Sequence, residues 1–267
     1  MKGSSKSLIT KKTPETFSSL KKSFSNTGKM TMFAVRFFKE LFLPPYEFSE
    51  FARQSYKIGY KSLPLVAITG FIMGLVLTIQ ARPTLSEFGA ESWLPGMVAL
   101  SLIREIAPVI TALICAGKIG SGIGAELGSM KVSEQIDAME VSAVDPFKYL
   151  VITRILATTL MIPLLVFFAD TVGMLGSYVA INIHGDVSMF RFFSQAFADM
   201  DFIDLIPATI KTLFFGFFIG LIGCYKGYHA DNGTESVGTA ANSSVVAASL
   251  TIFIVDMVAV QITDLMS

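Results

Sequence analysis

The amino-acid sequence predicts an all-α integral membrane protein: five transmembrane helices, preceded by an interfacial amphipathic helix, with a further short helix in a cytoplasmic loop. Three observations lead to this fold class. The 267 residues are 52% hydrophobic but only 16% charged, whereas soluble domains usually carry about a quarter charged residues. The mean hydropathy is +0.60. Several apolar stretches also reach the roughly 20 residues that a helix needs to cross the hydrocarbon core of a bilayer.

The first 62 residues precede these stretches and are more polar. Residues 1–29 are rich in Lys and Ser and lack the apolar run of a signal peptide. We expect a disordered basic cytoplasmic tail there, with an organellar transit peptide as the alternative. Residues 30–62 are expected to form an interfacial or elbow helical segment, and a soluble helix packed on a partner is a second interpretation. Its apolar residues recur at helical spacing before a Pro-Pro pair: Met30, Phe33, Phe37 and Leu41.

Residues 63–264 are predicted to form one five-span domain. The expected spans are 63–81, 94–115, 149–183, 202–225 and 243–262. If the N-terminus is cytoplasmic, fifteen of the 21 Lys and Arg residues lie in cytoplasmic segments and two lie outside. Because Lys and Arg accumulate on the cytoplasmic side of membrane proteins, we expect the N-terminus inside and the C-terminus outside.

Ionisable residues inside the predicted spans are expensive to bury and mark candidate functional sites. Arg104, Glu105, Lys211 and Asp256 lie at similar depth in the outer half of the membrane. We predict that they form one interacting polar cluster, because pairing removes much of the penalty of burying a charge. The cluster either only ties helices together or lines a water-accessible cavity that meets a charged headgroup. Asp170 lies nearer the outer interface by the same count and is expected to be solvated.

The loop between the second and third expected spans predicts an amphipathic helix over residues 131–143. Its apolar residues repeat at helical spacing: Val132, Ile136, Met139 and Ala143. Acidic and other polar residues occupy the remaining positions, so this helix is suited to dock on a soluble partner. Asp145 and Pro146 then provide an N-cap and a first helical residue for the third span.

Glycines at four-residue spacing indicate close helix packing in the first and fourth spans. The pairs are Gly70 with Gly74 and Gly216 with Gly220. Such spacing lets two helix backbones approach closely within a membrane. The sequence leaves open whether these faces pack within one chain or between two chains.

Composition and motifs exclude several classes of function. The balance of 21 basic and 21 acidic residues does not indicate nucleic-acid binding. Two Cys and two His residues make neither a disulfide framework nor a metal site. The G-x-G-x-x-A match at residues 120–125 lacks the strand that a dinucleotide site requires before it. We therefore expect no metal, no cofactor and no ATP-hydrolysing motif in this chain, and no enzymatic activity of its own.

An ordered series of motifs resembles the MlaE family of ABC-transporter permeases. The series begins with Arg104-Glu105-Ile106-Ala107-Pro108, Ala116-Gly117-Lys118 and Ala125-Glu126-Leu127-Gly128-Ser129-Met130. It continues with Glu134-Gln135-Ile136-Asp137-Ala138-Met139-Glu140, Asp145-Pro146, Arg154, Gly223-Cys224-Tyr225-Lys226-Gly227, Ser236-Val237-Gly238 and Asp256. The resemblance covers roughly residues 45–264. Lys118 departs from the Arg that the family often has, and residues 231–234 are more polar than its usual Gly-rich turn.

The resemblance implies a homodimeric permease of the bacterial inner membrane whose cytoplasmic coupling helix binds a separate ATPase subunit, which holds ATP and Mg. It implies phospholipid transport to or from a periplasmic lipid-binding protein of the MCE class, and thereby a role in outer-membrane lipid asymmetry. The implied substrate-binding residues are Leu75, Thr78, Ile79, Gln80, Arg104 and Glu105. The implied ATPase-coupling residues are Glu134, Gln135, Asp137, Met139 and Glu140.

Two other functions compete with this interpretation. An ion-coupled secondary transporter or channel would use the intramembrane charges for coupling, but it would need no partner at the inner loop. A lipid-modifying enzyme would need a nucleophile with a neighbouring base or a metal cluster, and the sequence offers neither pattern.

Overall fold

A computed structural model describes residues 28–183, 185, 187–198, 200, 202–231 and 233–266, with the side chains of residues 202–204 and 266 excepted. The chain divides into two compact units, Met1–Pro45 and Tyr46–Ser267. The expectation of a disordered tail over residues 1–29 falls almost entirely outside the described residues. Each unit is described separately below.

In the described part of the first unit, residues 28–41 form a helix that ends shortly before Pro44-Pro45. The Arg36 guanidinium and the Glu40 carboxylate form an ion pair of 2.6 Å one turn apart. Large apolar side chains are exposed along the same helix and just after it: Met32, Val35, Phe38 and Phe42. An exposed apolar row beside charged residues is typical of a helix that lies in a membrane interface.

The described residues of the second unit form five helical segments that are long and apolar enough to cross a membrane, as the sequence predicted. They are α2 (Phe48–Glu87), the composite segment Glu91–Val132, the composite segment Phe147–Asn182, α9 (Phe202–Tyr228) and α10 (Thr234–Met266). Every segment is longer than the apolar stretch that predicted it. Backbone hydrogen bonding continues a helix beyond the hydrocarbon core wherever the sequence contains no strong stop signal. Residues 48–62 accordingly belong to the first long helix.

The second membrane-crossing segment is assembled from short pieces of helix. It begins with a single 3₁₀ turn, η1 (Glu91–Trp93), and ends in α5. The pieces that follow η1 are, in chain order, α3 (Leu94–Ser101), the π-helix η2 (Leu102–Ile106), α4 (Ala107–Cys115), the π-helix η3 (Ala116–Gly120) and α5 (Ser121–Val132). Pro108 is the second residue of α4, just after η2, and has no N–H to give to the preceding turn. A π turn inserts a residue into the helical repeat, so it changes which side chains share a face.

The third membrane-crossing segment begins with the π-helix η4 (Phe147–Ile152) and continues as α7 (Thr153–Asn182). The Asp145 carboxylate accepts hydrogen bonds from the backbone N–H groups of Phe147 and Lys148, at 3.0 and 3.4 Å. This arrangement is the N-cap that the sequence predicted for the third span.

The glycine faces pack within the chain. A Cβ added at Gly70 would lie 2.8 Å from the carbonyl oxygen of Ala169, and one added at Gly216 would lie 2.6 Å from the carbonyl oxygen of Thr158. Both partners belong to α7, so α7 is held between α2 and α9 by direct backbone contact. The question that the sequence left open is therefore answered for these positions: they join helices of one chain.

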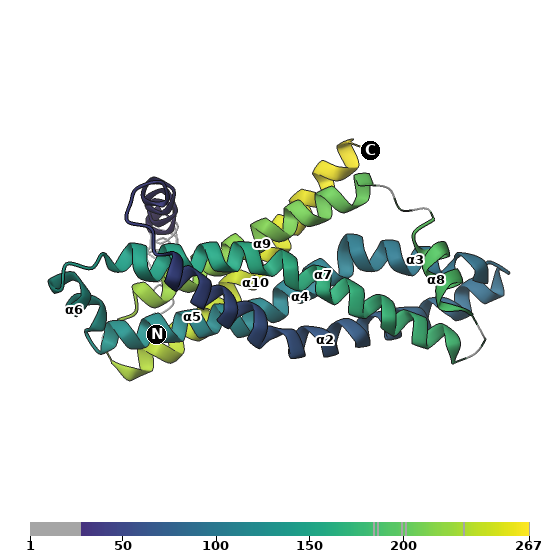
Figure 1. Cartoon of the computed structure of the whole chain (residues 1–267), viewed down its shortest axis with the longest axis horizontal. Helices are drawn as coiled ribbons and strands as arrows, with labels where there is room; N and C mark the ends of the chain where they lie inside the picture. The colour runs from purple at the N-terminus through teal and green to yellow at the C-terminus, as the bar shows by residue number, and fades with distance from the viewer. Residues whose placement is uncertain are drawn as a thin grey trace, which may run out of the picture. The chain divides into compact units, whose positions relative to one another are not determined.

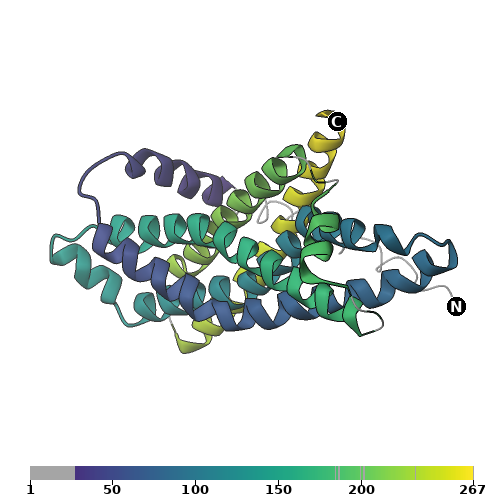
Figure 2. The same ribbon diagram turned by 45° about the vertical axis from the view of Figure 1, so that its right-hand side comes forward.

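Short helices mark the two ends of the second unit (Figures 1 and 2). At one end, α6 (Gln135–Val141) follows α5 after a break at Glu134, whose φ of 57° lies in the left-handed region. This break makes α6 shorter than the helix expected over residues 131–143. At the other end, α8 (Met189–Ala196) packs against α3 through the fully buried Phe192. α8 lies between the third and fourth predicted spans, where the sequence predicted no helix.

Candidate functional site

A charged cluster joins three helices inside the five-span unit. The Lys211 ammonium on α9 lies 2.7 Å from Oε2 of Glu105 and 3.0 Å from Oδ1 of Asp256. Lys211 is buried, with 3% of its surface exposed, whereas the Glu105 and Asp256 side chains are 39% and 19% exposed within a single chain. The three residues come from η2, α9 and α10, so the cluster links the second, fourth and fifth spans.

The cluster lies well inside the helices that carry it, by residue count. Lys211 is nine residues from the beginning of α9 and Asp256 is ten residues from the end of α10. At 1.5 Å per residue, both lie about 14–15 Å along their helices from the same end of the unit. At that depth water competes poorly, so an unpaired charge would be destabilising and a paired one is retained.

The π-helix η2 places two neighbouring charged residues on this site. A cavity beside the cluster is lined by Arg104 and Glu105 from η2 and by Lys211 from α9. Its other lining residues are Pro207, Ala208, Ala259, Val260 and Thr263. Adjacent residues on an α-helix point about 100° apart. Arg104 and Glu105 nevertheless both line the cavity. The two positive charges of Arg104 and Lys211 balance the two negative charges of Glu105 and Asp256. Three of the four residues of the predicted cluster thus line this cavity, and Asp256 contacts one of them, Lys211.

Two of the membrane-crossing helices, α10 and α2, are left largely uncovered by the chain itself. Only 11% of the most apolar stretch of α10 and 28% of that of α2 are buried, against 67% for the segment that contains α7. Exposed side chains on these two helices are large and apolar: Ile68, Ile72, Val76, Ile79, Val246, Leu250, Phe253, Ile254 and Met257. Since Glu105 and Asp256 are the more exposed members of the cluster, it is partly open within the single chain.

The four residues expected on α2 for substrate binding do not share one environment. Ile79 and Gln80 are exposed and Leu75 is half-buried. Thr78 differs from the expectation, because it is 1% exposed and faces α7. Its hydroxyl donates to the carbonyl oxygen of Gly74 at 2.8 Å and lies 2.7 Å from the Ser177 hydroxyl. Thr78 therefore belongs to the α2–α7 contact that the neighbouring glycines create.

Asp170 corrects a second expectation. It was expected to be solvated, but it is buried in α7 with 8% of its surface exposed. It lies twelve residues from the end of α7, or about 18 Å along the helix axis, farther than Lys211 and Asp256 lie from the ends of their helices. Its burial follows from the face of α7 that it occupies, because Asp170 lines a cavity together with residues of α4 and α9.

A second ion-pair network lies toward the α6 end and was not predicted. Glu126 on α5 accepts from Lys57 on α2 at 2.5 Å and from Arg154 on α7 at 3.0 Å. Arg154 is 1% exposed and also donates to the carbonyl oxygen of Leu150 at 2.9 Å. An ionisable residue within an apolar stretch was the available signal for Arg154. Its partner Glu126 stands 28 residues away in sequence, so only the tertiary structure identifies the pair.

The residues expected to couple to an ATPase lie on and just before α6. Glu134, Gln135, Asp137 and Glu140 are exposed, and Met139 is half-buried. Ile136 fixes α6 to the unit, since it is 1% exposed. Lys131 at the end of α5 forms an ion pair of 2.7 Å with Asp137. Three acidic residues are therefore exposed here: Glu134 just before α6, and Asp137 and Glu140 on it. The charge of Asp137 is partly neutralised by Lys131.

The described part of the chain forms five helical segments long and apolar enough to cross a membrane, three of which meet in a charged cluster, and this arrangement defines a multi-pass membrane protein. A family model described as Permease MlaE matches residues 51–262. The chain therefore belongs to the MlaE permease family. It is 38% identical over 227 residues to a probable ABC transporter permease protein of Rickettsia bellii, covering 85% of this chain and 88% of the relative. It is 36% identical over 197 residues to a probable ABC transporter permease protein of Synechocystis, covering 74% and 75%.

A plant relative is also similar to this chain. The chloroplastic protein named TRIGALACTOSYLDIACYLGLYCEROL 1 of Arabidopsis thaliana is 35% identical over 206 residues. The similarity covers 77% of this chain and 59% of the plant protein. The family and these relatives support assignment of the chain as a permease subunit of an ABC transporter, which works with an ATPase subunit.

Proposed function

We propose that this chain is the membrane permease of an ABC transporter that moves phospholipid between the inner membrane and a periplasmic MCE-type lipid-binding protein. A separate ATPase supplies the energy and holds ATP and Mg. The permease acts as a homodimer, with the uncovered faces of α2 and α10 toward the second copy. The chain itself carries out no catalysis.

The observation that carries this proposal is the partly open charged cluster beside uncovered apolar helices. A phospholipid presents a charged headgroup and long apolar chains, so it needs both kinds of surface next to each other. Lys211 stays buried between Glu105 and Asp256, while Glu105 and Arg104 line the neighbouring cavity. The plant relative is named after a glycerolipid, trigalactosyldiacylglycerol, and this name supports a lipid substrate.

The proposed orientation puts α6 in the cytoplasm and α8 in the periplasm. The excess of Lys and Arg in the segments at the α6 end supports it. An odd number of spans then places the C-terminus in the periplasm. In this orientation the acidic residues of α6 face the ATPase, and the charged cluster lies in the periplasmic half of the membrane.

The test is lipid transfer by the purified complex in proteoliposomes. The permease with its ATPase should transfer a fluorescent phospholipid to or from the MCE-type protein only when ATP is added. Glu105→Gln should lower this transfer at least tenfold. Glu91→Gln is the matched control, because Glu91 is an exposed carboxylate at the outer end of the second span, and it should transfer normally.

The same assay separates the competing function. Lipid movement by this chain alone under an ion gradient, with no ATPase attached, would support an ion-coupled secondary transporter instead. ATP-dependent transfer that the Glu105→Gln variant performs at the normal rate would leave the permease role intact and remove the charged cluster from the lipid path.

A further inference from the structure

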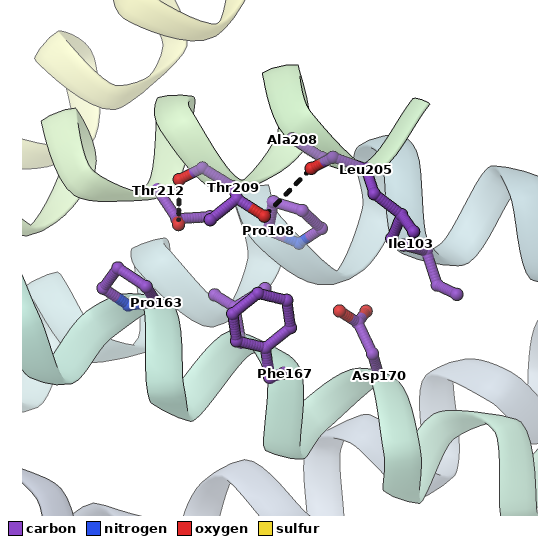
Figure 3. A pocket seen from close by; sticks show the side chains of 10 residues that line it. Ile103, Pro108, Pro163, Phe167, Asp170, Leu205, Ala208, Thr209 and Thr212 are labelled. Atoms are coloured by element: carbon purple, nitrogen blue, oxygen red, sulfur yellow. Dashed lines mark hydrogen bonds between the residues drawn. The ribbon is translucent and has the colours of Figure 1, made fainter. Parts of the chain in front are cut away.

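Asp170 is a buried acid that the proposed transport site does not use. Its carboxyl group points from α7 into the space between α7 and α9 (Figure 3). Its Oδ1 atom is fully buried and has no hydrogen-bond partner within the described residues. The cavity in front of it measures about 10 Å³, close to the room that one water molecule needs.

Only a few polar groups line this cavity. Besides Asp170, the polar side chains are those of Thr209 and Thr212 from α9. Pro108 from α4 and Pro163 from α7 also line the cavity. The other lining residues are apolar: Ile103, Val166, Phe167, Leu205 and Ala208. Asp170 is therefore the one titratable residue of the lining. Three charged residues that are close in sequence to lining residues line the neighbouring cavity of the charged cluster instead: Arg104, Glu105 and Lys211. The two cavities share Ala208 in their linings.

The lining offers hydrogen-bond acceptors and no donor. The Thr209 hydroxyl donates its proton to the carbonyl oxygen of Leu205 at 2.9 Å, and the Thr212 hydroxyl donates to the carbonyl oxygen of Thr209 at 2.7 Å (Figure 3). Pro108 and Pro163 have no N–H, and the remaining lining residues lie inside helices, where N–H groups are used along the helix. Each threonine oxygen can therefore only accept a further hydrogen bond.

An acceptor-only lining suits a neutral carboxylic acid and disfavours a carboxylate. An ionised carboxylate can only accept hydrogen bonds, whereas the protonated acid carries one O–H donor. Burying a charge without a partner is strongly unfavourable. A protonated Asp170 can donate toward Thr209 or Thr212, and a single bridging water fits the cavity.

A divalent cation fits this cavity less well than a proton. Calcium and magnesium take six or more oxygen ligands. The side chains here supply two carboxyl oxygens from Asp170 and one hydroxyl oxygen each from Thr209 and Thr212. The cavity leaves room for one water at most.

We propose that Asp170 is a proton-binding site in the third span, which holds its proton while α7 and α9 are packed as in this structure. The proton stays on a carboxyl oxygen of Asp170 and forms a hydrogen bond toward the threonine oxygens of α9. Opening of the α7–α9 contact would hydrate the group and release the proton. The site is separate from the charged cluster, so it stands independently of the proposed lipid path.

Infrared spectroscopy of the complete transporter complex in lipid nanodiscs tests this assignment. At neutral pH the wild-type complex should show a carbonyl-stretch band of a protonated carboxylic acid, and Asp170→Asn should remove it. The exposed acid Glu91 provides the matched control, since Glu91→Gln should leave the band unchanged. Asp170→Asn should also assemble normally, because the amide has the shape of the neutral acid and can donate in its place.

Four results would overturn the proposal. Wild type could lack the band at neutral pH, or the band could survive in Asp170→Asn. The Asn variant could fail to assemble while Glu91→Gln assembles, which would mean that a charged group is needed at this position. Finally, the band could disappear on addition of sodium at constant pH, which would assign the cavity to a metal cation.

Discussion

Lys211 is the residue on which the charged cluster depends. One ammonium group lies within 3.0 Å of two carboxylates from two other helices. Removing the shared cation leaves two acids facing each other, whereas removing one acid leaves an ion pair. The three positions are therefore not equivalent, although each contributes one formal charge.

We expect Lys211→Met to destabilise the protein more than Glu105→Gln or Asp256→Asn. Breaking a buried ion pair typically costs about 3–5 kcal/mol, and the partial exposure of Glu105 places the expected value at the lower end. Chemical unfolding of the complex in detergent measures this difference. Lys226→Met, the same substitution near the end of α9, is the control and should change stability little.

The double variant Lys211→Met with Glu105→Gln should lose less stability than the sum of the two single variants, because charges in contact are not additive. Strict additivity, or a Lys211→Met protein as stable as wild type, would show that the contacts contribute nothing.

Among the helices, α2 and α7 pack closely because glycines, which have no side chain, lie at their contact. The Cβ of an alanine at Gly74 would overlap the backbone of Gly173. Because the obstacle is backbone rather than the end of a flexible side chain, the two helices would have to move apart. Thr78 and Ser177, whose hydroxyls lie 2.7 Å apart, would separate with them.

Gly74→Ala should therefore lower the melting temperature of the complex. Overpacking a tight contact typically costs about 1–3 kcal/mol, and the backbone position of this clash favours the upper end. Gly122→Ala on α5 serves as the control, since a Cβ there would meet nothing within 4 Å, and alanine favours a helix. Equal melting temperatures for the two variants would contradict the packing argument.

The short helix α6 makes a separate prediction. Glu134→Lys with Glu140→Lys reverses two exposed charges without disturbing the Lys131–Asp137 ion pair. We expect this double variant to insert in the membrane normally and to retain less ATPase subunit on purification, because a docking surface of the opposite charge is no longer matched. Glu91→Lys, at the other end of the unit, should retain the ATPase fully. A normal yield of ATPase with the double variant would exclude the acidic face of α6 from docking.

For the whole molecule, the uneven burial of its helices is the main feature. The segment that contains α7 is surrounded by its own chain, whereas α10 is covered on only a small part of its surface. Lipid chains can cover an apolar face, but they cannot also cover the partly exposed carboxylates of Glu105 and Asp256. A second copy of the chain on this side would shield both kinds of surface.

We expect native mass spectrometry of the purified complex to show two copies of this chain. Replacing Leu250 and Ile254 on α10, both exposed, with Lys should shift the complex toward a single copy. The same replacements at Leu160 and Leu164, which are exposed on α7, should leave the stoichiometry unchanged. A single copy in the wild-type complex would contradict the prediction outright.

The sequence by itself determined the fold class and the five spans, and it singled out the ionisable residues of the charged cluster as candidates. Apolar stretches of sufficient length have one stable arrangement in a bilayer, because only helices satisfy their backbone hydrogen bonds within a single segment. Ionisable residues in those stretches stand out for the same reason, so Glu105, Lys211 and Asp256 could be grouped by counting depth alone. The N-cap at Asp145 was predictable because capping is local.

Only the tertiary structure decided which groups meet. The spacing of Gly70 and Gly74 predicted a close contact but not its partner, because any small residue on a neighbouring helix could provide it. The Glu126–Arg154 pair depends on two helices lying side by side. The burial of Thr78 and Asp170 depends on which face of α2 and α7 turns inward. In a membrane every face of a helix is apolar, so the pattern that distinguishes inside from outside in a soluble protein is missing, and packing between helices decides it.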